Sequence, residues 1–296
     1  MRFAAVLALA ACSIAAGCGG SSSAQEEPNA PTLEALWRAP GEDVAVVPGS
    51  ADFGPGTVRF TFLVIDGQGR LVTRPTAKIW LARGLKSKPF AQSTARSESI
   101  GVGESEPGEA EEIFVAELEL KQPGTYWLLA EPVGGRKIQA VGNVVVKEET
   151  SAPAVGAPAI ASETPTLANA TLEQLTTSTE PDEELYRSSI AGALAAGAPF
   201  VVAFATPKYC TSRTCGPVVE VVSDVRRRHA DDGVRFIHVE IYEDNDPTKG
   251  QNAWVREWKL PSEPWVFLVG ADGKIAARFE GTVSVRELDE AVGRLQ

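Results

Sequence analysis

One continuous apolar segment, Phe200-Val201-Val202-Ala203-Phe204-Ala205, most constrains how the second half of this 296-residue chain can fold. Apolar residues at every position, and not at alternate ones, indicate a central strand that is buried on both faces. Such a strand requires other layers over both faces of its sheet. Two cysteines, Cys210 and Cys215, follow the segment closely, so we expect them to lie where this strand ends.

Helical and strand-like patterns alternate around this strand. The first helical pattern, 184–196, ends directly before Gly197, and glycine commonly terminates helices. Ala271-Asp272-Gly273-Lys274 has the composition of a hairpin turn. The patterns predict helices at 184–196, 218–228, 248–258 and 285–295, and strands at 200–205, 234–241, 265–269 and 275–279.

Several of these segments resemble the thioredoxin-fold family. Phe204 to Cys210 is similar to the family's passage from central strand to redox helix, Ser262-Glu263-Pro264 to its cis-proline segment, and Gly281 to the residue after its last strand. The resemblance implies an α/β thioredoxin fold over 184–296 and a thiol–disulfide oxidoreductase activity. Glu263 stands where the family usually has a small or apolar residue.

The spacing of the two cysteines differs from the family's motif, because four residues separate them instead of two. In a continuous helix, residues five apart rise about 7.5 Å and lie about 140° apart, beyond the roughly 7 Å Cα limit for a disulfide. A Cys210–Cys215 bond therefore requires an interrupted helix. Either the helix begins at Gly216-Pro217, after both cysteines, or a turn unwinds on oxidation, as in atypical two-cysteine peroxiredoxins.

The position of the pair predicts a role for each cysteine. Cys210 follows a strand and faces the N-terminal end of a helix, which favours its thiolate form. We therefore expect Cys210 to be the nucleophile and Cys215 the resolving cysteine. The resemblance implies that Pro264 shapes a substrate groove, with Tyr209 and Trp265 beside it. Two alternatives stay open: a non-catalytic binding protein with a static disulfide, and a peroxiredoxin-like peroxidase.

Residues 33–148 consist of short runs in which apolar and polar residues alternate, and turn residues separate these runs. Positions 58, 60, 62 and 64 are Val, Phe, Phe and Val, and Asp66-Gly67 follows as a turn signal. About seven strands at this spacing predict an all-β sandwich. Tyr126 directly after a Pro-Gly-Thr segment resembles the tyrosine corner of immunoglobulin-like folds. We therefore expect an immunoglobulin-like β-sandwich that presents the redox module or binds a partner.

The N-terminal residues predict where the protein is located. Residues 1–17 combine one early arginine with a short apolar run, as in a secretory signal peptide. Ala15-Ala16-Gly17-Cys18 resembles a bacterial lipoprotein signal, which implies lipid attachment at Cys18. We expect a cell-envelope protein anchored to the outer face of a bacterial membrane, with cleavage by ordinary signal peptidase and secretion as the alternative.

Composition limits the partners. The net charge of −11 argues against nucleic acid. Two histidines and a single methionine argue against imidazole-rich or soft metal sites, so we predict no metal and no cofactor. Residues 18–32 and 149–183 have the composition of a tether and a linker. We expect a monomer whose partners are extracytoplasmic proteins with thiols or disulfides.

Overall fold

The computed structural model of the chain describes residues 30–102, 111–133, 138–210 and 214–295. Pro31–Gln296 forms one compact unit. Within the described ranges, no helix combines the length and the apolar character that a bilayer span requires. The predicted signal peptide (1–17) and Cys18 lie outside the described residues.

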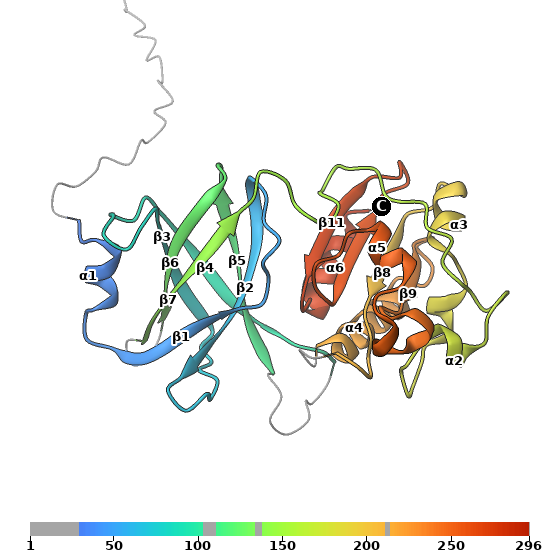
Figure 1. Ribbon diagram of the computed structural model, residues 1–296, viewed down its shortest axis with the longest axis horizontal. Helices are drawn as coiled ribbons and strands as arrows, with labels where there is room; N and C mark the ends of the chain where they lie inside the picture. The colour runs from blue at the N-terminus through green and yellow to red at the C-terminus, as the bar shows by residue number, and fades with distance from the viewer. Residues whose placement is uncertain (1–29, 103–110, 134–137, 211–213, 296) are drawn as a thin grey trace, which may run out of the picture. The chain divides into compact units, whose positions relative to one another are not determined.

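Seven strands between residues 42 and 146 form a closed barrel (Figure 1). Around the barrel the strands follow the order β1-β2-β5-β4-β3-β6-β7, and a short parallel pairing between β1 and β7 closes it. All the other neighbouring pairs are antiparallel. The strands are β1 (Glu42–Pro48), β2 (Gly56–Asp66), β3 (Thr76–Ala82), β4 (Ala91–Ser99), β5 (Glu112–Leu120), β6 (Gly124–Val133) and β7 (Ile138–Val146).

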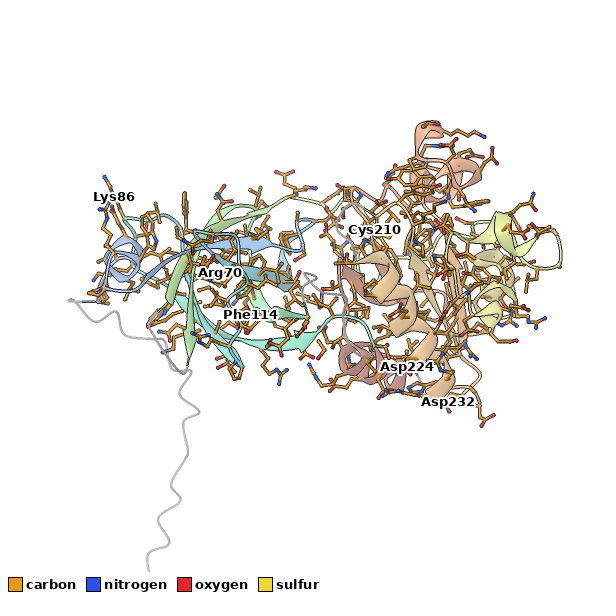
Figure 2. All side chains as sticks on the ribbon, turned by 90° about the horizontal axis from the view of Figure 1, so that it is seen from below. Arg70, Lys86, Phe114, Cys210, Asp224 and Asp232 are labelled. Atoms are coloured by element: carbon orange, nitrogen blue, oxygen red, sulfur yellow. A yellow bond between two sulfur atoms is a disulfide. The ribbon has the colours of Figure 1, made fainter. Side chains whose placement is uncertain are left out.

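Aromatic side chains on alternate positions fill the barrel. Phe60, Phe62 and Val64 are buried, as the period of two in this segment predicted. The Phe62 ring stacks on Phe60 and on Phe114, with ring centroids 5.3 and 5.1 Å apart. Phe114 is labelled inside the barrel in Figure 2. This stack supplies the largest apolar surfaces of the barrel core, and such surfaces dominate core energetics.

The prediction of an immunoglobulin-like sandwich is wrong. A sandwich divides its strands between two sheets, whereas here each strand pairs with both neighbours in one continuous ladder that closes on itself. The signal at Tyr126 is nevertheless a real local structure: its hydroxyl donates to the carbonyl of Gln122 at 2.8 Å and accepts from the Gln122 N–H at 3.1 Å. Such a corner fixes one strand connection and does not determine whether the sheet closes.

A second sheet of four strands lies in residues 200–280 (Figure 1). Its order is β11-β10-β8-β9, with β8 parallel to β9 and antiparallel to β10. Every residue of β8 and β10 is buried, as the continuous apolar run at 200–205 predicted for β8. The strands are β8 (Phe200–Phe204), β9 (Arg235–Val239), β10 (Trp265–Val269) and β11 (Ile275–Glu280).

Most helices around this sheet are short. The helix predicted at 184–196 is divided into a 3₁₀ turn and a short α-helix, because the Ser189 hydroxyl caps α3 by accepting from the Gly192 N–H at 2.9 Å. The helix predicted at 248–258 begins only at Ala253, after Asn252 caps it. The α-helices are α1 (Leu33–Trp37), α2 (Leu172–Leu175), α3 (Ile190–Ala195), α4 (Cys215–Arg228), α5 (Ala253–Glu257) and α6 (Val285–Gly293); the 3₁₀ turns are η1 (Glu183–Tyr186), η2 (Glu243–Asn245) and η3 (Pro247–Lys249).

The prediction of an α/β thioredoxin fold must therefore be corrected. Most of the regular structure in the described residues is strand, in the seven-stranded barrel and the four-stranded sheet. Apart from α4, no α-helix in the described ranges exceeds nine residues. Capping side chains inside the helical patterns shorten these helices, and apolar periodicity alone does not show where a cap interrupts it.

The linker predicted at 149–183 follows the surface of the four-stranded sheet. Residues 156–159 pair with the first residue of β11 and with the turn before it. Three backbone hydrogen bonds, each 2.8–2.9 Å long, run from Gly156 N to Ile275 O, from Ile275 N to Ala157 O and from Ala159 N to Gly273 O. Nearer the start of the linker, the Asp52 carboxylate accepts the N–H groups of Ser151 and Ala152. The division of the chain into domains at this linker stays a prediction.

Ion pairs whose carboxylates are largely buried connect the barrel to the second sheet and its helix α6. Arg59 of β2 pairs with Glu287 of α6 at 2.7 Å, and both side chains are at most 15% exposed. Arg278 of β11 lies 3.4 Å from Asp52, whose side chain is 1% exposed. Glu98 of β4 pairs with Arg286 of α6. These contacts hold α6 and β11 against the barrel.

Candidate functional site

The candidate site lies at the end of the four-stranded sheet where β8 and β9 finish and β10 begins. In the register of the sheet, Phe204 at the end of β8 is opposite Val239 at the end of β9 and opposite Trp265 at the start of β10. The segment that carries Cys210 therefore leaves the sheet where Glu240 leaves β9 and where the chain enters β10 after Glu263. Three separate segments thus meet at this end of the sheet.

Cys210 and Cys215 form a disulfide, with their Cα atoms 5.9 Å apart. Helix α4 begins at Cys215, so only one of the two cysteines is helical. The expectation that a bond requires an interrupted helix is confirmed, although the helix begins one residue before the predicted Gly216-Pro217. Pro217 is tolerated there because the first four N–H groups of a helix have no partner within it.

The two cysteines differ in accessibility. Cys215 is fully buried, whereas Cys210 is partly exposed. Cys210 precedes the beginning of α4, and Figure 2 labels Cys210 and Asp224 towards opposite ends of this helix. The N–H of Cys215, the first of the helix, points at the Cys210 sulfur at 3.3 Å. Helix N-terminal N–H groups stabilise negative charge, so this contact favours a thiolate at Cys210 over one at Cys215.

Glu263 stands beside the disulfide. Its carboxylate and the two Sγ atoms all lie within 4.8 Å of one another. The peptide bond from Glu263 to the buried Pro264 is cis, as the resemblance implied. Burial raises the pKa of Glu263 and the negative charge of Glu240 adds to this, against the opposing effect of a hydrogen bond from the Tyr242 hydroxyl, 3.4 Å long. The sequence drew attention to Glu263 only as a departure from the family pattern.

A hydrogen-bond chain that starts from the buried Glu240 fixes the loop that precedes Cys210. The Glu240 carboxylate accepts the N–H and the hydroxyl of Thr177 at 2.6 and 2.8 Å. The Thr177 hydroxyl in turn accepts the N–H of Lys208 at 3.2 Å. Glu240 is 5% exposed, and its second oxygen has no hydrogen-bond partner in the described part of the chain. Sequence reasoning missed Glu240, although an acidic residue directly after a buried strand could have indicated it.

His238 belongs to the core of this region. Its Nε2 lies 3.0 Å from the carbonyl of Ala205 and its Nδ1 lies 2.8 Å from the Tyr186 hydroxyl. Burial lowers the pKa of His238, and the carboxylate of Glu240 and the Ala205 contact only partly offset this. Burial likewise raises the pKa of Tyr186. A neutral imidazole that accepts from Tyr186 and donates to Ala205 satisfies all three groups.

The three residues predicted to form the substrate groove have different surroundings. Tyr209 is partly exposed and lines a cavity of about 350 Å³. Trp265 is fully buried: its ring stacks on Phe267 at 5.5 Å, and its indole N–H donates to the Ser262 hydroxyl at 3.1 Å. Pro264 is buried between the site and the core. Of the three, only Tyr209 offers surface to an incoming molecule.

Comparison with known proteins gives few matches. No protein-family model and no curated protein matches the chain. Solved structures similar to parts of it include a thiol:disulfide interchange protein of the thioredoxin family from Chlorobium tepidum, with 16% identity over 34% of this chain and 81% of that one, and a TM-score of 0.27. A superoxide reductase (neelaredoxin) from Ignicoccus hospitalis shows 14% identity over 38% of this chain and 86% of that one, with a TM-score of 0.19. At these TM-scores the site must be argued from its own residues.

Proposed function

We propose that the chain is a thiol–disulfide oxidoreductase whose Cys210–Cys215 pair exchanges electrons with protein thiols. One observation carries the proposal: the disulfide joins a partly exposed sulfur to a buried one, and a helix N-terminal N–H points at the exposed sulfur. An exchange centre needs this asymmetry, because one sulfur must meet the substrate while the other waits to resolve the intermediate.

The proposed cycle needs only the two cysteines and a substrate disulfide. The Cys210 thiolate attacks one substrate sulfur, and a mixed disulfide forms as the other substrate sulfur leaves as a thiolate that takes up a proton. The Cys215 thiol loses its proton and attacks Cys210, which forms the Cys210–Cys215 bond and releases the second substrate thiolate. The substrate gains two electrons and the pair loses two. The reverse steps oxidise a substrate dithiol.

The cavity of about 350 Å³ is the proposed docking site for the substrate segment. Tyr209, the residue before Cys210, lines it, and both polar and apolar groups form its walls, which suits an extended peptide. Its walls come from the linker, from the loop before Cys210 and from η2, and include Leu172, Glu173, Thr177, Lys208, Tyr209 and Asn245.

The test is disulfide reduction by the full chain, with insulin as substrate and a dithiol as electron donor. Cys210→Ser is expected to reduce the rate to the background of the donor alone, and Cys215→Ser to accumulate a mixed disulfide visible on a non-reducing gel. Cys12→Ser is the matched control and should keep the rate of the unmodified chain. A Cys210→Ser variant as active as the unmodified chain would overturn the proposal.

A static disulfide is the second candidate, and the complete burial of Cys215 favours it. The reduction potential separates the two. Structural disulfides in secreted proteins have potentials below about −300 mV, whereas exchange centres such as protein disulfide isomerase lie near −180 mV. Equilibration with glutathione and dithiothreitol buffers, followed by thiol counting, measures it. A potential below about −300 mV without substrate turnover would assign the static role.

We also propose that lipid attached at Cys18 holds this centre at the outer face of a bacterial membrane. Support comes from the apolar leader and from Ala15-Ala16-Gly17-Cys18. When the full chain is expressed in a bacterium and extracted with a phase-separating detergent, it should enter the detergent phase. Cys18→Ser should move it to the aqueous phase and Cys12→Ser should not. A Cys18→Ser protein still in the detergent phase would contradict the anchor.

A further inference from the structure

Three potential metal-binding atoms converge at the site from three separate segments. The sulfur of Cys210 comes from the loop after β8, the sulfur of Cys215 from the first residue of α4, and the carboxylate of Glu263 from the loop before β10. All three atoms lie within 4.8 Å of one another. This end of the folded sheet, and not a local sequence motif, brings them together.

Small side-chain shifts would bring these atoms to the separations of a tetrahedral zinc site. With Zn–S bonds near 2.3 Å and Zn–O bonds near 2.0–2.2 Å, neighbouring ligand atoms lie about 3.4–3.8 Å apart. The sulfurs must separate when the disulfide is reduced, and the carboxylate must approach them by at most about 1.4 Å. Side-chain rotation in the partly exposed Cys210 and Glu263 can supply such shifts without a change of backbone.

The surroundings of Glu263 favour a cation. Within the described residues, Glu263 forms no ion pair, and its hydrogen bond with Tyr242 is long, 3.4 Å. Glu240, which is buried, adds a second negative charge that acts on Glu263. Reduction of the disulfide adds two thiols that can become thiolates. A divalent cation would offset this accumulated negative charge, and Tyr242 would orient the carboxylate as an outer ligand partner does.

We infer that the reduced Cys210–Cys215 pair and the Glu263 carboxylate together bind one Zn²⁺ ion, with water as the fourth ligand. Two sulfur ligands and one carboxylate select zinc over Mg²⁺ and Ca²⁺, which prefer all-oxygen sites. On binding, each thiol releases its proton, so two protons leave for each zinc bound. Oxidation to the disulfide removes both thiolates and must release the metal. Zinc and disulfide exchange would then compete for the same sulfurs.

The experiment uses the full chain with Cys12 and Cys18 replaced by serine, so that only this pair supplies thiols. Tris(carboxyethyl)phosphine reduces the disulfide to two thiols and takes the oxygen of one water. After its removal under anaerobic conditions, Zn²⁺ is titrated against a chromogenic chelator. We expect one zinc per reduced chain, none per oxidised chain, and no competition from Mg²⁺.

Two glutamate variants test the carboxylate ligand. Glu263→Gln should weaken zinc binding about 10-fold or more, whereas Glu243→Gln, an exposed glutamate of η2, should leave it unchanged. Co²⁺ as a spectroscopic probe should show a sulfur-to-cobalt charge-transfer band that is lost in Cys215→Ser. Absence of zinc binding by the reduced chain, or equal affinity in Glu263→Gln and the parent, would overturn the inference.

The zinc site requires only that the disulfide can be reduced, so it and the proposed function fail separately. Zinc binding without insulin reduction would leave the metal site standing and remove the oxidoreductase. Insulin reduction without zinc binding would do the reverse. Folding of each variant is checked by far-UV circular dichroism, and the parent titration decides the inference even where one variant does not fold.

Discussion

The barrel and the four-stranded sheet bury their strands in different ways. In the barrel strand β4 few positions are buried, and all the others are partly or fully exposed, because one face of the strand points outward. In β8 and β10 every residue is buried, because both faces of the sheet are covered. A strand covered on both faces has no side-chain surface to offer a ligand. Its chemistry is confined to the segments where the chain enters and leaves the sheet, and there Cys210, Glu240 and Glu263 meet.

The substitution with the largest expected effect lies in the barrel core and tests the role of the barrel in this comparison. Phe62→Ala, in the middle of the aromatic stack, should lower the free energy of unfolding by about 3–5 kcal/mol, measured by urea denaturation. The disulfide-exchange rate at temperatures where the variant is folded should not change. Phe90→Ala, at a ring that is 50% exposed, is the matched control and should change stability by less than about 1 kcal/mol. A large loss of exchange activity in folded Phe62→Ala would show that the barrel core controls the site.

The ion pair of Arg59 and Glu287 tests whether the two regions unfold together. Arg59→Met leaves Glu287 buried without its partner and should destabilise the chain by about 3 kcal/mol. The double variant Arg59→Met/Glu287→Leu should recover part of this loss, because no uncompensated charge remains. Denaturation followed by two probes, one reporting on each region, checks the coupling. Unchanged stability in Arg59→Met would mean that the contact does not hold the regions together.

Reduction of the disulfide should have a smaller effect. A closed loop of this length stabilises by about 2 kcal/mol in the chain-entropy model. Comparison of the oxidised and reduced chain in urea, without metal ions, measures it. Added Zn²⁺ should restore stability to the reduced chain and not to its Glu263→Gln variant, because a ligand that binds only the folded state stabilises it. Equal stability of the oxidised and reduced chain would show that the bond does not restrict the unfolded state.

The smallest expected effect concerns pH. Burial would raise the pKa of Asp52, but hydrogen bonds from Ser151, Lys147 and Ala152 and the charge of Arg278 outweigh it and lower the pKa below 3.8. A lowered folded-state pKa stabilises the protein above the unfolded value, and this contribution is lost as pH falls through the folded one. The stability difference between the parent and Asp52→Asn should therefore be constant well above pH 3.8 and shrink as the pH falls below that value. Asp231→Asn, at an exposed position, should show no such trend.

The sequence predicted the strands better than the way they assemble. Alternation identified β2, and the unbroken apolar run identified β8, because each pattern reflects how many faces of a strand are buried. Closure of the barrel depends on the pairing of β1 with β7, which joins only two residue pairs from distant parts of the chain. No local pattern encodes so short a contact, so a sandwich and a barrel look alike in sequence.

The site was predictable in part for the same reason. Cys210, Cys215 and the cis bond before Pro264 belong to local segments whose spacing and composition carry a signal. The approach of Glu263 to both sulfurs depends on the register between β8 and β10, and the role of Glu240 depends on the register between β8 and β9. Such cross-strand relations appear only once the strand order is known.

The pairing of residues 156–159 with β11 has one further consequence. β11 is the outermost strand of its sheet, and an unprotected outer strand can pair with the same strand of another molecule. The segment around Pro158 occupies the backbone groups of Ile275 and Gly273 instead, and proline has no N–H with which to recruit another strand. A stretch whose composition indicates a mere connector thus covers the beginning of this outer strand against pairing with another molecule.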